Sequence, residues 1–321
     1  MAFYLVSGAG GFIGSHLVNS LIEDGHEVRA VDVKKFNKWE QINPYAENLV
    51  ADMSLLHHAL EMTKGVDRAF LLAADMGGML FIHNNRVATL HSVDITSASF
   101  RSCDMNDVKR VFQASSACVY PAYRQNDANV TSLKESDAWP ADPERPYGFE
   151  KLYGEDFCHW YAAEGRLETR VARYHNVYGP FTTYQGGREK APAAICRKVI
   201  EAKLSGVHEI EVYGDGEQTR SFMYIDDCVK GTRMIMDSEI EIPLNLGSSE
   251  LVSVNQLVDI VEDIAGIKVK RNYDLTKPQG VRGRNSDNTL IQELFGWEPS
   301  ITLRDGLEKT YEWVYNRVVS S

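Results

Sequence analysis

Short apolar runs alternate with amphipathic stretches through the first half of the chain. The apolar runs have the composition and length of buried strands, at residues 3–8, 27–33, 67–74, 109–115 and 168–179. The stretches between them carry apolar side chains at helical spacing, at residues 12–25, 91–103 and 146–165. Strands that alternate with helices predict a parallel, doubly wound α/β sheet.

The alternation becomes looser in the second half of the chain. The pattern there predicts a helix at residues 190–206, a strand with a turn at 209–216 and a helix at 253–266. We therefore expect a first domain over residues 1–175 and a smaller, mainly substrate-binding lobe over residues 176–321. The chain is expected to pass between the two lobes.

The first predicted strand leads into the glycine-rich segment SGAGGFIG, which opens the first predicted helix. Gly8, Gly11 and Gly14 form a variant of the dinucleotide fingerprint, whose glycines let the backbone approach a pyrophosphate at the helix N-terminus. Asp32 ends the next strand, where a carboxylate suits the ribose hydroxyls of NAD and repels the extra phosphate of NADP. This combination predicts a Rossmann-type domain that binds NAD.

Further contacts with NAD are expected around this loop. Asp52 either lies against the adenine or caps a helix, and both alternatives stay open. The expected contacts of this region are Gly8, Gly11, Phe12, Ile13, Gly14, Asp32, Asp52 and Met53.

Composition and charge narrow the classes of function. The 321 residues are 44% hydrophobic and 25% charged, which is ordinary for a globular chain with a large core. The net charge of −11 argues against nucleic acid or an anionic membrane as the main partner. Five widely spaced cysteines without a C-x-x-C predict neither a disulfide framework nor a metal site, and they favour a reducing cytoplasm. The N-terminus lacks the basic region of a signal peptide, and no apolar run approaches the roughly 18 residues of a membrane span.

The segment PYGFEK carries the clearest candidate for proton transfer. Tyr147 and Lys151 stand four residues apart, on one face of a predicted helix. The ammonium, with the nicotinamide cation close by, is expected to lower the tyrosine pKa from its ordinary value of about 10. Such a tyrosine can take a proton from an alcohol while a hydride leaves for NAD. Ser116 is the expected polar anchor beside it, and the alternative is a surface lysine over a packed tyrosine.

These residues together resemble a known family. The glycine loop, Ser116 and Tyr147-x-x-x-Lys151 resemble the extended short-chain dehydrogenase/reductases that act on nucleotide sugars, and residues 213–227 (YGDGEQTRSFMYIDD) are similar to their second lobe. The resemblance spans nearly the whole chain. It implies an NAD-dependent epimerase, dehydratase or decarboxylase, with Tyr147 and Lys151 also contacting the cofactor. A dehydratase of this family would carry an acidic pair where Ala117 and Cys118 stand, so that reaction is not favoured.

Three longer segments resemble the GDP-mannose 3,5-epimerases. They are residues 73–82 (AADMGGMLFI), 173–198 and 280–288 (GVRGRNSDN). The resemblance implies GDP-mannose as substrate, transient oxidation at C4 by NAD, inversion at C5 and C3 through enolates, and reduction to GDP-L-galactose, or to GDP-L-gulose after inversion at C5 alone. It also implies that Cys118 and Lys190 are the acid/base pair. The alternatives are a packed cysteine and a lysine that only binds a diphosphate.

The same resemblance implies the remaining contacts and the assembly. The expected substrate contacts are Gly77, Ser116, Ala117, Cys118, Asn176, Glu189, Lys190, Ala191, Lys198, Gln218, Thr219, Arg220 and Arg284. A homodimer is expected through the helices around residues 84–104 and 147–164. Leu80 and Phe149 depart from the family pattern, where we expect glycine and leucine, and these departures bear on how the ring is positioned.

Two other readings of the function stay open. The first is a 4-epimerase or another epimerase that acts on a different nucleotide sugar, in which Cys118 only packs. The second is a non-catalytic NAD-sensing protein, which would need none of the catalytic side chains. A cysteine hydrolase built on Cys118 and His175 fits poorly, because it leaves the dinucleotide loop unexplained. Exchange of the C3 and C5 hydrogens with solvent distinguishes the first prediction from the others.

Overall fold

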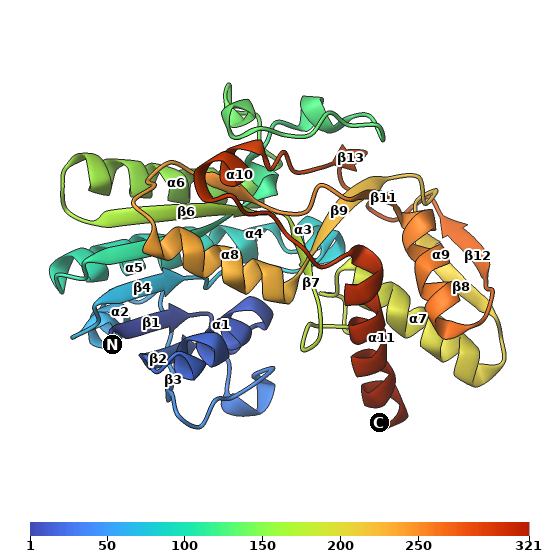
Figure 1. Cartoon of the computed structure of the whole chain (residues 1–321), viewed down its shortest axis with the longest axis horizontal. Coiled ribbons are helices and arrows are strands. Elements are labelled where there is room, and N and C mark those ends of the chain that lie inside the picture. Colours follow the sequence, from blue (N-terminus) through green and yellow to red (C-terminus); the bar gives the residue numbers. More distant parts are fainter. Residues whose placement is uncertain (321) are drawn as a thin grey trace.

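A seven-stranded parallel sheet forms the centre of the computed structural model, which describes residues 1–320 (Figure 1). The strand order is β10-β6-β5-β4-β1-β2-β3, and all neighbours run parallel. The strands are β1 (Phe3–Ser7), β2 (Glu27–Asp32), β3 (Glu47–Val50), β4 (Arg68–Leu71), β5 (Arg110–Ser116), β6 (Glu168–Tyr174) and β10 (Leu244–Leu246). The order reverses at β1, so the predicted doubly wound fold is confirmed.

Helices cover both faces of this sheet, because successive side chains of a strand point to opposite faces. In β1, Val6 packs in one core with α1 and α8, whereas its neighbour Leu5 packs in another with α2 and α5. The helices are α1 (Phe12–Glu23) and α8 (Ile225–Asp237) on one face and α2 (Leu56–Thr63), α5 (Ser92–Met105) and α6 (Tyr147–Ala163) on the other. Because helices cover both faces of the sheet, all seven residues of β5 are buried.

A second lobe lies beyond the carboxyl ends of these strands (Figure 1). One of its sheets contains β7 (Asn176–Tyr178), β9 (Thr219–Tyr224), β11 (Leu251–Ser253) and β13 (Gly283–Arg284). The other pairs β8 (Glu209–Tyr213) with β12 (Lys270–Asp274). Three mutually packed helices cover them, α7 (Ala191–Ser205), α9 (Val254–Ala265) and α11 (Leu303–Val319).

The chain crosses between the lobes where the pattern suggested one continuous strand. The predicted strand at residues 168–179 is divided into β6 and β7 at His175, whose N–H donates to the carbonyl of Leu246 in β10 (3.0 Å). After the second lobe begins, α8 and β10 return to the central sheet. The division of the chain at residue 175 stays a prediction.

Shorter elements lie around the junction of the lobes. They are α3 (Met79–Asn84), α4 (Arg86–Leu90), α10 (Thr289–Phe295) and the 3-10 turns η1 (Phe36–Lys38), η2 (Ala117–Val119), η3 (Ala122–Gln125) and η4 (Glu135–Ala138). The carboxyl ends of β1, β2 and β5 bring Ser7, Asp32 and Ser116 to one edge of the sheet. Across residues 1–320, no helix is both long and apolar enough to cross a membrane.

Candidate active site

The glycine loop joins β1 to α1 in a tight turn. Gly8 has a left-handed φ of +77°, and its N–H donates to the carbonyl of Val31 in β2 (2.8 Å). A Cβ at Gly14 would lie 2.2 Å from the Gly8 oxygen, so only glycine allows the first turn of α1 to pack against the loop. The loop thereby presents bare backbone at the start of a helix, which is the cradle that a pyrophosphate requires. Phe12 and Ile13 begin α1 and pack partly into the core.

The acidic residues predicted to contact NAD lie at the ends of their strands. The Asp32 carboxylate accepts hydrogen bonds from the N–H of Gly10 (3.1 Å) and the N–H of Lys34 (2.9 Å), which places it against the glycine loop. One oxygen of Asp52 accepts from the N–H (2.9 Å) and the hydroxyl (2.7 Å) of Ser54, a local turn interaction. Asp52 does not cap α2, whose N-cap is Leu55 without a side-chain hydrogen bond, and contact with the adenine stays a prediction. Next to it, Met53 is buried in the core.

Tyr147 and Lys151 occupy the first turns of α6 and are both buried. The Lys151 ammonium lies 5.6 Å from the centroid of the Tyr147 ring. A Cβ at Gly148 would lie 2.0 Å from the Cys118 oxygen, so this glycine lets the start of α6 pack directly on η2. The structure thus brings the predicted tyrosine, lysine and cysteine together, and Ser116 interacts with the phenol.

The protein chain raises the pKa of Tyr147 instead of lowering it. Burial is the largest cause, and the negative charges of Cys118 and Glu150 add to it, while the Ser116 hydrogen bond and Arg284 act in the opposite direction. The lowering that the sequence predicted from Lys151 is therefore not found in the chain alone, and Lys151 is not among the causes that act on this pKa.

Cys118 lies at the end of β5, within η2, and faces a cation. Its N–H donates to the Ser116 hydroxyl (3.2 Å), and Nη1 of Arg284 donates to its sulfur (3.2 Å). Arg284 is buried and also donates to Oε1 of Gln125 (2.6 Å). Arg284 of β13 thus brings a positive charge to the Cys118 sulfur.

The surroundings of the other cysteines and of His175 differ from those of Cys118. Burial raises the pKa of Cys103, Cys196 and Cys228 to about 12, as expected of packing residues. Burial lowers the pKa of His175 to about 3, and its Nε2 pairs with Oδ1 of Asn245 (3.2 Å). Because this histidine is paired with an amide and held neutral, the arrangement does not support a cysteine–histidine hydrolase.

Lys190 reaches the site from the second lobe. It is the residue directly before α7, which begins at Ala191. Removal of the ammonium from water lowers the pKa of Lys190, and the neighbouring Cys118 opposes that shift. The two predicted acid/base residues therefore lie close enough for their charges to interact.

The predicted substrate contacts come mostly from the second lobe and form two groups. Arg220 and Arg284 are register partners in β9 and β13. The Arg220 guanidinium donates to the carbonyls of Val281 (2.6 Å) and Gln279 (3.2 Å), and burial lowers its pKa to about 9. Nearby, Nδ2 of Asn176 donates to the carbonyl of Ser221 (3.0 Å).

The second group gathers around Tyr213, which the sequence did not single out. The Lys198 ammonium lies 4.6 Å from the centroid of the Tyr213 ring, and Nε2 of Gln218 donates to the Tyr213 carbonyl (2.8 Å). The Oε1 atom of Gln218 is buried without a hydrogen-bond partner, which suits a residue that contacts a ligand. Gly77, Ala117, Glu189, Ala191 and Thr219 lie in the loops and element ends around the two groups.

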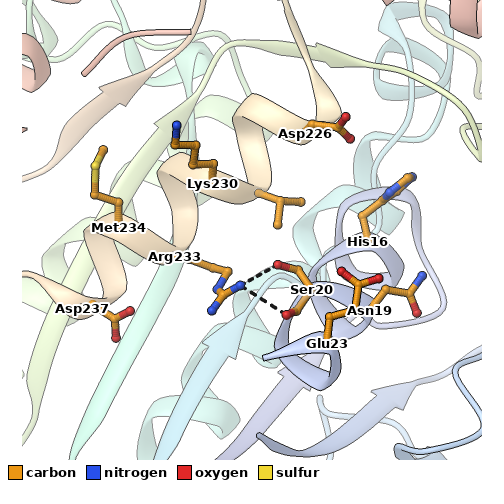
Figure 2. Close-up of a pocket in the computed structure, with 10 residues that line it drawn as sticks. His16, Asn19, Ser20, Glu23, Asp226, Lys230, Arg233, Met234 and Asp237 are labelled. Atoms are coloured by element: carbon orange, nitrogen blue, oxygen red, sulfur yellow. Dashed lines mark hydrogen bonds between the residues drawn. The ribbon is translucent and has the colours of Figure 1, made fainter. Parts of the chain in front are cut away.

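A separate pocket of about 520 Å³ lies between α1 and α8 (Figure 2). His16 lines it from α1, and Asp226 and Lys230 line it from α8. Arg233 donates across it to the carbonyl (3.2 Å) and hydroxyl (2.7 Å) of Ser20. None of the predicted site residues lines this pocket, so it is distinct from the candidate active site.

The fold and the glycine loop define an α/β protein of the dinucleotide-binding class. A model of the NAD dependent epimerase/dehydratase family matches residues 4–247. The chain belongs to this family, and NAD is its cofactor.

Particular relatives are similar over nearly the whole chain. The protein is 45% identical to GDP-mannose 3,5-epimerase 1 of Oryza sativa subsp. japonica and 43% identical to GDP-mannose 3,5-epimerase of Arabidopsis thaliana, in both cases over 98% of this chain and 82% of the relative. Among solved structures, UDP-glucose 4-epimerase of Thermotoga maritima with UDP-glucose has a TM-score of 0.87 at 26% identity, covering 99% of this chain and all of the other. MoeE5 in complex with UDP-glucose and NAD has a TM-score of 0.81 at 30% identity, covering 99% of each chain.

Proposed function

We propose that the protein is a GDP-mannose 3,5-epimerase, an NAD-dependent isomerase. The observation that carries the proposal is Cys118, a thiol that lies beside Tyr147 and accepts a hydrogen bond from Arg284. A 4-epimerase inverts C4 by oxidation and reduction alone and needs no second acid/base pair. Inversion at C5 or C3 proceeds by removal and return of a proton, so it requires an acid and a base on opposite faces of the ring. The relatives named GDP-mannose 3,5-epimerase support this choice of substrate.

The first half of the reaction is oxidation at C4. A bound NAD would supply the hydride acceptor for this oxidation and the hydride donor for the final reduction. Tyr147 receives the proton of the C4 hydroxyl, Ser116 holds the phenol in place, and Lys151 contributes positive charge beside it. The cradle around Gly8 and Gly14 is the expected site of the pyrophosphate.

The second half is inversion next to the new ketone. The ketone acidifies the hydrogens on C5 and C3, because each resulting carbanion is an enolate. The Cys118 thiolate takes the proton from one ring face, and the Lys190 ammonium gives a proton to the other. The thiol and amine then regain their starting charges by proton transfer between them or with water. The product after both inversions is GDP-L-galactose.

We further infer a homodimer, a cytoplasmic location and two domains. Residues 1–175 would bind NAD, and residues 176–321 would mainly bind the substrate. The dimer is supported by Phe149, Tyr153 and Trp160, large apolar side chains that are exposed along α6. The location is supported by five free, buried cysteines, which suit a reducing compartment.

The test is incubation with GDP-mannose in D2O, followed by NMR of the recovered sugar nucleotides. We expect deuterium at C5 and C3 and a sugar of inverted configuration, without a stoichiometric demand for added NAD. Inversion at C4 alone, with no deuterium on carbon, would instead establish a 4-epimerase. Binding of NAD with no turnover of any sugar nucleotide would favour an NAD-sensing protein.

A further inference from the structure

Arg188 connects two loops that belong to different lobes. We call residues 73–82, which follow β4 and include the first turn of α3, the roof loop. We call residues 185–190, which precede α7, the lysine loop. Nη1 of Arg188 donates to Oδ1 of Asp75 (2.7 Å) and to the carbonyl of Met76 (3.1 Å). Its guanidinium also lies 3.6 Å from the centroid of the Phe81 ring. One side chain of the lysine loop thus contacts three residues of the roof loop.

The backbones of the two loops also meet. The Gly78 N–H donates to the Arg188 carbonyl (3.0 Å). A Cβ at Gly78 would lie 2.4 Å from the carbonyl oxygen of Glu189, so a larger residue would push the loops apart. The backbones therefore approach closely at Gly78, next to the contacts that the Arg188 side chain makes.

Each loop contributes residues to one side of the candidate active site. Phe81 and Ile82 of the roof loop pack with Cys118 and Tyr147, and Met76 packs against the same cluster. The lysine loop ends two residues after Arg188, at Lys190. The separation of the two loops therefore influences the separation of Lys190 from Cys118.

We propose that Arg188 is a positioning residue for inversion at C5 and C3. Through its contacts with Asp75 and Phe81 it holds Lys190 on the opposite side of the sugar ring from Cys118. Arginine suits this role because its planar guanidinium can donate hydrogen bonds and stack on a ring at once, which the ammonium of lysine does not do. The inference rests on the proposed function. Oxidation at C4 uses Tyr147 and Lys151, which lie on α6 and are placed mainly by the packing of α6 on η2.

The experiment compares Arg188→Met, Arg188→Lys and Asp75→Asn with the wild-type protein and GDP-mannose in D2O. The absorbance of transient NADH reports oxidation, and NMR separates deuterium in recovered substrate from deuterium in inverted product. For Arg188→Met we expect inversion to fall roughly tenfold, the effect of losing an ion pair and a cation–π contact together. Oxidation should stay within about twofold of wild type, the scatter of a surface substitution.

The ratio of the two deuterium pools is the decisive readout. If Lys190 is misplaced, Cys118 returns protons to the same ring face, so deuterium in substrate should increase relative to deuterium in product. Arg188→Lys and Asp75→Asn should give intermediate ratios. Arg304→Met is the matched control, because Arg304 is an exposed arginine paired with Glu308 on α11 and should leave the ratio unchanged.

Two failures can be told apart. If the wild-type protein places no deuterium at C3 or C5, the proposed function is wrong. A different result would overturn only the positioning role of Arg188. In that case the wild-type protein inverts C5 and C3, but Arg188→Met and Asp75→Asn keep the wild-type ratio of deuterium in substrate to deuterium in product. Equal losses of oxidation and inversion in these variants would have the same meaning. Thermal melting of each variant establishes that a loss of inversion is not a loss of fold.

Discussion

Arg284 is predicted to keep the Cys118 thiol reactive. The guanidinium donates to the sulfur over 3.2 Å, and both side chains are buried. A hydrogen bond to a charged group contributes about 1.5–3 kcal/mol, and about 1.36 kcal/mol changes a rate tenfold. Arg284→Met removes the charge but keeps a long apolar side chain. It should therefore lower the rate of alkylation at Cys118 by roughly 10- to 100-fold, because the sulfur loses a charged hydrogen-bond donor.

The assay is alkylation by iodoacetamide, followed at Cys118 by peptide mass spectrometry. The remaining cysteines provide the internal reference, because burial raises the pKa of each of them above its usual value; they are Cys103, Cys158, Cys196 and Cys228. They should react far more slowly than Cys118 in the wild-type protein. The assay needs no sugar nucleotide, so its result is independent of the substrate.

A matched control and a charge-conserving variant separate charge from access. Arg282→Met removes a guanidinium two residues away that pairs with Asp215 (2.8 Å), and it should leave the alkylation of Cys118 unchanged. Arg284→Lys keeps a positive charge, so it should retain more of the wild-type alkylation rate than Arg284→Met. Equal rates for Arg284→Met and wild type at pH 7 would refute the reasoning.

Three further predictions test the chemistry directly. Cys118→Ala should retain transient NADH but take up no deuterium at C3 and C5 in D2O; uptake at the wild-type rate would show that the thiol only packs. Tyr147→Phe should lower kcat roughly 10²–10⁴-fold with NAD still bound, and near-normal turnover would exclude its role as general base. Glu150 lies 3.6 Å from the Lys151 ammonium, and its carboxylate adds to the burial that raises the pKa of Tyr147. Glu150→Gln should lower that pKa and move the acidic limb of the kcat profile to lower pH, while Cys118 and Arg284 beside the phenol are unchanged; a limb that stays in place or moves upward would contradict this.

The parts of the molecule that sequence predicts well are set by local spacing. The glycine loop follows β1 and opens α1 as expected, and Tyr147 and Lys151 lie on one helix because they are four residues apart. The helix expected at residues 91–103 is α5, which spans Ser92–Met105. In each case the pattern that defines the element lies within the element itself.

The parts that sequence predicts poorly depend on pairing between distant segments. The three residues of β10 are too few to show a period, and they form a strand only because β6 offers an unpaired edge. The sequence placed Arg284 among the expected substrate contacts, and the structure adds a hydrogen bond from its guanidinium to the Cys118 sulfur, 166 residues away in the chain. Nothing near either residue in the sequence signals that contact. The same holds for Arg188, whose partners precede it by more than a hundred residues.

Three glycines mark places where two stretches of backbone approach closely. Gly14 meets the Gly8 carbonyl in the cofactor loop, Gly148 meets the Cys118 carbonyl where α6 packs on η2, and Gly78 meets the Glu189 carbonyl between the roof and lysine loops. At each contact a Cβ would lie within 2.4 Å of an oxygen, so the absence of a side chain permits the approach. The sequence identified only the first of these as functional, because it alone lies in a known fingerprint. The other two lie where α6 packs beside Cys118 and where the lysine loop meets the roof loop, so they help to bring the three residues predicted to transfer protons, Tyr147, Cys118 and Lys190, together.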